Sequence, residues 1–211
     1  MKFLTEQETF WAKEFGNKYI NRNKLSDILP KKINLFSEIL KSCSPVKKII
    51  EFGSNTGVNL IAINTILPLV KLSAVEINSQ AVTHIKKLKL CEKIWNKSML
   101  DFKSKTKYDL SFTSGVLIHI NPEYLDVAYK SLYENSKRYI LIIEYYNPYP
   151  IEIDYRGHKN RLFKRDFAGD IMSKYKNVKL VNYGFKYKSD NNFPLDDVTW
   201  FLLEKKSKNL N

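Results

Sequence analysis

The stretch Val46–Leu67, VKKIIEFGSNTGVNLIAINTIL, decides the fold. Its first seven residues are rich in β-branched and apolar types, which is typical of a buried strand. Gly53 and Gly57 bracket a tight turn, because glycine adopts backbone conformations that other residues avoid. Val58–Leu67 is then expected to be helical, and Pro68 ends this helix. The stretch therefore predicts a strand, a tight turn and a helix in direct succession.

The same alternation continues along the chain. Further strands are expected at Lys71–Ile77, Lys93–Lys97, Tyr108–Thr113, Tyr139–Glu144, Lys179–Tyr187 and Val198–Glu204. Helices are expected at Thr5–Ile20, Ile33–Leu40, Ser79–Leu88, Asn121–Asn135 and Asp166–Tyr175. Repeated strand–helix units predict an α/β protein with a doubly wound, Rossmann-like sheet. In such sheets ligands bind at the carboxyl ends of the strands, so candidate site residues are sought there.

The length of 211 residues suits one α/β domain. We expect an N-terminal helical cap over residues 1–44, the α/β domain over 45–205 and a polar tail at 206–211. The first nine residues contain no apolar signal segment, and no run of ~18 apolar residues predicts a membrane span. Cys43 and Cys91 lack a CxxC spacing and are expected to be reduced. These features indicate a cytoplasmic protein, a monomer or homodimer, with no metal site.

The net charge of +13 raises the possibility of nucleic-acid binding. Only five of the 35 basic residues are arginine, and the lysines are spread along the chain. Lysine lacks the planar fork with which arginine holds phosphate. We therefore expect a solvated lysine surface that favours anionic ligands, and nucleic acid is not the expected partner.

Candidate site residues follow the first four strands. Glu51–Gly57 carries glycines at both ends, but Asn55 replaces the middle glycine of a pyrophosphate-binding fingerprint. Glu76 ends the second strand, where a carboxylate can bind ribose hydroxyls. Ser98–Met99 and Ser114–Gly115 follow the third and fourth strands. An ordinary turn or a solvated strand-end carboxylate remains the alternative at each position.

His119 lies close behind the fourth strand, between two isoleucines. An imidazole titrates near neutral pH and can act as a general base. A buried structural histidine is the alternative interpretation.

In this order the segments resemble class I S-adenosylmethionine-dependent methyltransferases. The flanks resemble a narrower family, the pseudaminic acid biosynthesis-associated methylases. The residues that carry this resemblance are Thr5–Trp11, Phe15–Gly16, Tyr19–Asn23, Glu144–Pro148, Tyr155–His158, Leu162–Gly169 and Asp197–Glu204. Lys13 departs from the family pattern, which favours a small residue there. The resemblance implies a seven-stranded sheet with the last strand antiparallel, N-terminal helices that cap the site, and S-adenosylmethionine as cofactor.

The resemblance also implies site residues. Those expected to bind the cofactor are Tyr19, Arg22, Glu51, Gly53, Asn55, Thr56, Gly57, Glu76, Ile77, Ser98, Met99, Ser114 and Gly115. The segment after the fifth strand is expected to bind the acceptor through Tyr145, Tyr146, Asn147, Tyr155, Arg156, His158, Lys164 and Arg165. The candidate general bases are His119, His158 and Asp166. For Arg165, an ion pair with Asp166 or Asp170 is an equal alternative to an anionic ligand.

The predicted function is methyl transfer to oxygen or nitrogen of a small, anionic or sugar-like acceptor. The family name points to an amino sugar or a nonulosonate-type glycan precursor. An RNA methyltransferase, a NAD-dependent oxidoreductase and a non-catalytic S-adenosylmethionine-binding or scaffold protein are the alternatives. No RNA-binding module is recognised, and the missing middle glycine argues against the oxidoreductase.

Overall fold

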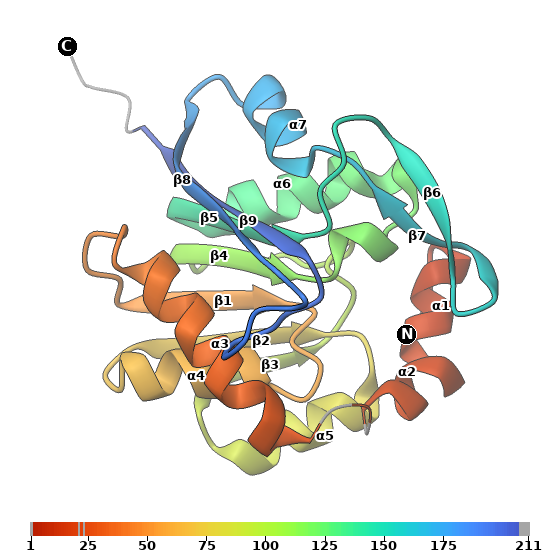
Figure 1. The fold of residues 1–211 in the computed structure, drawn as a ribbon, viewed down its shortest axis with the longest axis horizontal. Helices are drawn as coiled ribbons and strands as arrows, with labels where there is room; N and C mark the ends of the chain where they lie inside the picture. The colour runs from red at the N-terminus through yellow and green to blue at the C-terminus, as the bar shows by residue number, and fades with distance from the viewer. Residues whose placement is uncertain (1, 21, 23, 207–211) are drawn as a thin grey trace.

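The computed structural model describes residues 2–20, 22 and 24–206, so most of the predicted polar tail lies outside the described residues. Figure 1 shows the helices and strands in their order along the chain. They are α1 (Glu6–Ala12), α2 (Glu14–Tyr19), α3 (Leu25–Leu40), β1 (Lys48–Phe52), α4 (Val58–Ile66), β2 (Lys71–Glu76), α5 (Ser79–Leu88), β3 (Cys91–Asn96), β4 (Tyr108–Ser114), η1 (Leu117–His119), η2 (Pro122–Tyr124), α6 (Leu125–Asn135), β5 (Ser136–Glu144), β6 (Ile151–Tyr155), β7 (His158–Lys164), α7 (Phe167–Lys174), β8 (Val178–Lys186) and β9 (Val198–Lys205).

Seven strands form one sheet in the order β3-β2-β1-β4-β5-β9-β8. The first five strands of the chain pair in parallel, whereas β9 runs antiparallel to β5 and to β8. Phe52 at the end of β1 is opposite both Val75 of β2 and Thr113 of β4, so the carboxyl ends of these strands meet at one edge. The predicted seven-stranded, Rossmann-like sheet with an antiparallel last strand is confirmed.

Helices cover both faces of this sheet (Figure 1). On one face α3, α4 and α5 bury a cluster that includes Phe36, Ile63 and Ile85. On the other face α6 and α7 bury a second cluster around Leu132 and Ile171. The crossover from β3 to β4 has no helix, and residues 97–107 contribute buried apolar side chains to the second cluster instead. Two cores, one on each face, thus hold the sheet rigid behind its carboxyl edge.

The predicted continuous helix over Thr5–Ile20 is wrong, because the chain leaves the helical conformation at Lys13. Lys13 has φ −113° and ψ −137°, which separates α1 from α2. Thr5 caps α1, and its side chain accepts the Glu8 amide in a capping box. Figure 1 shows α1 and α2 beside the carboxyl edge of the sheet, next to β6 and β7. By contrast, α3 packs against α4 on the face of the sheet.

The segment after β5 forms a structure that the sequence did not predict, the antiparallel hairpin β6–β7. Arg156 and Gly157 make its turn with φ values of 51° and 80°, as tight two-residue hairpin turns require. The hairpin holds α1, since Gln7 donates to the Asn160 carbonyl and Arg161 pairs with Glu6 at 2.9 Å. Across the described part of the chain, every helix is too short or too polar to cross a membrane.

Candidate active site

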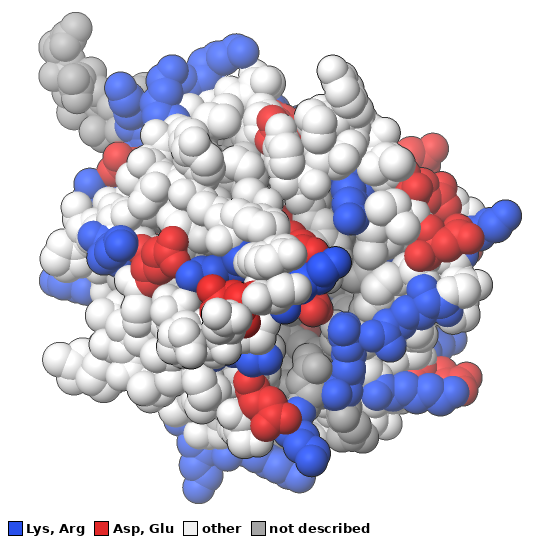
Figure 2. All heavy atoms as spheres, in the orientation of Figure 1, with Lys and Arg blue, Asp and Glu red and all other residues white. Residues whose placement is uncertain are grey.

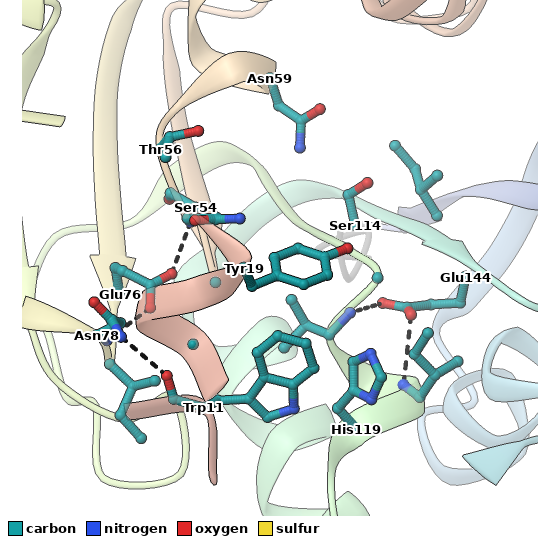
Figure 3. A pocket seen from close by; sticks show the side chains of 18 of the residues that line it. Trp11, Tyr19, Ser54, Thr56, Asn59, Glu76, Asn78, Ser114, His119 and Glu144 are labelled. Carbon is teal, nitrogen blue, oxygen red and sulfur yellow. Dashed lines mark hydrogen bonds between the residues drawn. The ribbon is translucent and has the colours of Figure 1, made fainter. Parts of the chain in front are cut away.

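A cavity of about 300 Å³ lies at the carboxyl edge of the sheet. The ends of β1, β2, β4 and β5 form its floor, and α1, α2 and the end of β6 cover it. Figure 3 shows Glu76 and Asn78 on one side of the cavity and Glu144 and His119 on the other. The cavity therefore lies where a doubly wound sheet binds its ligand.

The turn after β1 requires glycine at two places. Gly53 has φ +75° and Gly57 has φ +83°, a region that favours glycine. A Cβ atom on Gly53 would also overlap the Val116 side chain. The missing side chain lets Val116 pack against this turn, and Gly53 and Asn55 both line the cavity.

Glu76 is a cavity carboxylate that two backbone amides hold in place. Its two oxygens accept the Asn55 and Asn78 amides, each at 2.7 Å. Burial raises the pKa of Glu76, and the two backbone amides oppose that shift. Each oxygen keeps a free lone pair, which is the acceptor pair that a vicinal diol such as ribose requires.

Asn78 connects the N-terminal helices to the sheet. Its Oδ1 accepts the Gln80 and Ala81 amides at the start of α5. Its Nδ2 donates to the Trp11 carbonyl at 3.1 Å and to the Asn17 side chain at 2.8 Å. One side chain thus fixes the position of α1 and α2 over the cavity.

A carboxylate and a lysine lie deep between β1 and α3. Glu51 is fully buried, and burial raises its pKa to about 8, although Asn59 donates to it at 2.6 Å. Lys32 lines the cavity and lies 3.5 Å from the Ser114 hydroxyl. Burial lowers the pKa of Lys32, and the nearby Glu51 opposes this shift. Lys32 therefore gives this end of the cavity a partner for a carboxylate group, while Glu51 lies buried behind the lining.

Glu144 ends β5 and holds the segment that follows β4. Its carboxylate accepts the Val116 and Leu117 amides at 3.0 Å and the Ile118 amide at 3.4 Å. Burial raises the pKa of Glu144 to about 7, whereas these amides lower it. The three contacts fix η1, whose last residue is His119.

His119 is buried and faces the cavity (Figure 3). Its Nδ1 lies 2.6 Å from the Arg161 carbonyl, which can only accept a hydrogen bond. Nδ1 therefore carries the proton, and Nε2 keeps its lone pair. Burial lowers the pKa of His119 to about 4, so the ring is neutral at physiological pH.

Aromatic rings enclose His119 on the side of the N-terminal helices. The ring centroids of Trp11 and Tyr155 lie 4.5 and 4.9 Å from that of His119. Tyr19 contacts Trp11 edge-on at 5.2 Å. The buried Nε1 of Trp11 has no hydrogen-bond partner among the described residues. This aromatic wall makes one end of the cavity apolar and offers one unused donor.

The structure brings most of the predicted site residues together. Those that line the cavity are Tyr19, Arg22, Gly53, Asn55, Thr56, Glu76, Ile77, Ser98, Met99, Ser114, Gly115, His119, Tyr145 and Tyr155. Those outside its lining are Glu51, Gly57, Tyr146, Asn147, Arg156, His158, Lys164, Arg165 and Asp166. Glu51 and Gly57 lie directly behind the lining, whereas the others belong to the chain after β5.

Several predicted acceptor-binding groups have structural partners instead. Asp166 caps α7 by accepting the Gly169 amide at 2.8 Å. Arg165 pairs with Asp170 at 2.8 Å, as the alternative interpretation of this arginine expected. His158 is exposed, and its ring packs against Phe10. Their positions give no support to roles for these residues in acceptor binding or base catalysis.

The cavity also contains side chains that were not predicted as site residues, among them Glu8, Lys32, Asn78 and Glu144. Glu144 had a usable signal, because a carboxylate that ends an otherwise apolar buried strand points to the carboxyl edge. Lys32 had none, since it is one lysine among many on a surface helix.

The strand order and this cavity define the Rossmann-like methyltransferase fold. Magnesium protoporphyrin IX methyltransferase from Synechocystis PCC 6803 with bound S-adenosylhomocysteine has this fold, with a TM-score of 0.68, 12% identity and coverage of 95% of this chain and 100% of that chain. The plantazolicin methyltransferase BpumL in complex with S-adenosylhomocysteine has a TM-score of 0.66 and 12% identity, with coverage of 95% of this chain and 94% of that chain. The N-methyltransferase NodS from Bradyrhizobium japonicum WM9 has a TM-score of 0.64 and 11% identity, with coverage of 84% of this chain and 98% of that chain. No protein-family model matches the sequence, and no curated protein matches it significantly.

Proposed function

We propose that this protein is an S-adenosylmethionine-dependent methyltransferase that acts on a small acceptor in the cytoplasm. The observation that carries the proposal is the buried Glu76, held by two amides beside a glycine turn that leaves no room for a side chain. A nucleoside with a bulky 5′ substituent fits such a cradle. The bound ligands of the fold relatives point to the same class of donor.

The cavity residues divide along the length of such a donor. Glu76 would bind the ribose hydroxyls, and Ile77, Ser98 and Met99 would surround the adenine. Gly53, Asn55 and Ser114 would border the amino-acid end, where Lys32 and Arg22 are the cations for its carboxylate. Once bound, the donor supplies an electrophilic methyl group on sulfonium.

His119 is the group that would position the acceptor. Its Nε2 can accept a hydrogen bond from an acceptor hydroxyl, and it can take the proton as the new bond to the methyl carbon forms. An amine acceptor needs no such base, provided that it binds in the neutral form. Trp11 and Tyr155 exclude water and hold the acceptor in line, which supplies most of the acceleration in such displacements.

The acceptor that we propose is an amino sugar, nucleotide-activated or not, or a nonulosonate-type glycan precursor. Its support is the resemblance of the flanking segments and the aromatic wall, because flat rings stack on the apolar face of a sugar. Tyr145 and Tyr155 add hydroxyl groups at the same end of the cavity. The basic groups of β7 lie outside the lining, so the pocket favours the sugar ring itself over an extended anion.

Calorimetric titration with S-adenosylhomocysteine tests the donor. The native protein is expected to bind, and Gly53→Arg is expected to abolish binding, because the new side chain fills the turn. Circular dichroism must show that the variant is folded. Methyl transfer from labelled S-adenosylmethionine to a panel of amino sugars, free and nucleotide-activated, then tests the acceptor. No binding by the folded native protein would contradict the proposal.

A further inference from the structure

Glu8 is a buried carboxylate in an unexpected place. It belongs to α1, is 5% exposed, and lines the cavity beside Ser98. Its Oε1 accepts a hydrogen bond from the Ser98 hydroxyl, which follows β3. The N-terminal helix thus brings a negative group to the end of the cavity where the adenine of the proposed donor would lie.

The helix cap accounts for only one of the two carboxylate oxygens of Glu8. Oε2 accepts the Leu4 and Thr5 amides at 2.5 and 3.2 Å, which completes the capping box of α1. Oε1 takes no part in the cap and retains a second lone pair. A carboxylate oxygen can only accept hydrogen bonds, so it favours a ligand edge that donates.

We infer that Glu8 binds the exocyclic 6-amino group of the donor's purine ring, which rests on the proposed function. A 6-aminopurine presents an N–H₂ donor at this edge, whereas a 6-oxopurine presents a carbonyl oxygen. Two oxygens facing each other in a buried site repel and leave both unsatisfied. Glu8 therefore makes the site selective for adenine over hypoxanthine.

Helix α1 joins the proposed purine contact to the aromatic wall. Trp11 follows Glu8 by three residues, so both side chains lie on the same side of α1. A purine held by Glu8 fixes α1, and α1 carries the Trp11 ring of the aromatic wall. Donor binding is thus expected to reduce the motion of α1 and of the Trp11 ring that it carries.

The test compares Glu8→Gln with Glu6→Gln, the same chemical change two residues earlier. Glutamine also serves at this position of a capping box, so Glu8→Gln preserves the cap. Glu6 pairs with Arg161 on the surface and does not line the cavity. Each protein is titrated calorimetrically with S-adenosylhomocysteine and with S-inosylhomocysteine.

The native protein and Glu6→Gln are expected to prefer the adenine ligand by about 10- to 100-fold, the range for a hydrogen bond to a charged group. In Glu8→Gln this preference is expected to fall below about threefold. Hydrogen exchange of residues 6–12 should slow on addition of S-adenosylhomocysteine in the first two proteins and less in Glu8→Gln. An unchanged preference in Glu8→Gln overturns the inference alone, whereas a native protein that binds neither ligand overturns the proposed function with it.

Discussion

At the residue scale, the proposed chemistry depends on which nitrogen of His119 holds the proton. The Arg161 carbonyl fixes the proton on Nδ1, so Nε2 faces the cavity as an acceptor. We predict that His119→Ala lowers kcat about 100-fold, the typical effect of a lost base. Donor affinity should change by less than about threefold, because the contact is made to the acceptor. Steady-state kinetics and calorimetry measure the two quantities.

His158→Ala is the matched control for this prediction. His158 is exposed on β7 and packs against Phe10. Its replacement should leave kcat within about threefold of the native value, as for most surface changes. Equal losses in the two variants would contradict a specific role of the His119 ring.

At the element scale, α1 and α2 act as a cover that is separate from the cores. Of the described residues, those of α1 and α2 belong to neither buried cluster. The two helices are held by Asn78 and by the hairpin β6–β7. These contacts are few compared with those of a residue cluster in a packed core. The cover is therefore expected to open without global unfolding of the protein.

Gly16→Ala tests this separation. A Cβ atom on Gly16 would overlap the Trp11 carbonyl, the same atom that accepts from Asn78. We predict that affinity for S-adenosylhomocysteine falls by about tenfold or more. A loss of about 1.4 kcal/mol in the free energy of binding is enough for a tenfold change. The melting temperature should fall by no more than about 5 °C, because the cores are untouched. A cooperative loss of folding, seen by circular dichroism, would show that the cover belongs to the core.

At the scale of the whole molecule, buried ionisable groups couple stability to pH. The pKa of Glu51 is about 8 in the folded protein, against an ordinary value of 4.5. Between these values the folded protein keeps a proton that the unfolded chain has released. Glu51 therefore lowers stability progressively as the pH rises through this window. His119 acts in the opposite sense, since its pKa of about 4 costs stability as the pH falls below 6.5.

Glu51→Gln isolates the first of these effects. Glutamine does not titrate, and the contributions of His119 and Glu144 cancel in the comparison. We predict that the free energy of unfolding of the variant, relative to the native protein, rises by roughly 3 kcal/mol from about pH 5 to about pH 8. Urea denaturation at both pH values measures this difference. A constant difference would mean that Glu51 ionises in the folded protein as it does in water.

The net charge of +13 also belongs to the whole molecule. Figure 2 shows Lys and Arg side chains scattered over the visible face and interspersed with Asp and Glu. On that face they do not form the continuous basic stripe that backbone contacts with nucleic acid require. This face therefore gives no support for an RNA-binding stripe.

The sequence by itself determined the sheet and its ligand-binding edge. Three local patterns carry this information: the glycine turn after β1, the apolar strands and the carboxylate of Glu76. Each can be recognised within a few residues, because backbone geometry and the strand period depend on near neighbours in the chain. The same patterns placed Ser98, Ser114 and His119 at the cavity. These features needed no knowledge of distant contacts.

Only the tertiary structure decided which side chains cover the cavity. The hydrogen bonds of Glu8 with Ser98 and of Gln7 with the Asn160 carbonyl join segments 90 and 153 residues apart in the chain. Arg165 and Asp166 have the composition of a binding segment, yet an ion pair and a helix cap use them. The sequence left both uses of Arg165 open, because only the folded positions of the side chains set the distance between an arginine and each of its possible partners.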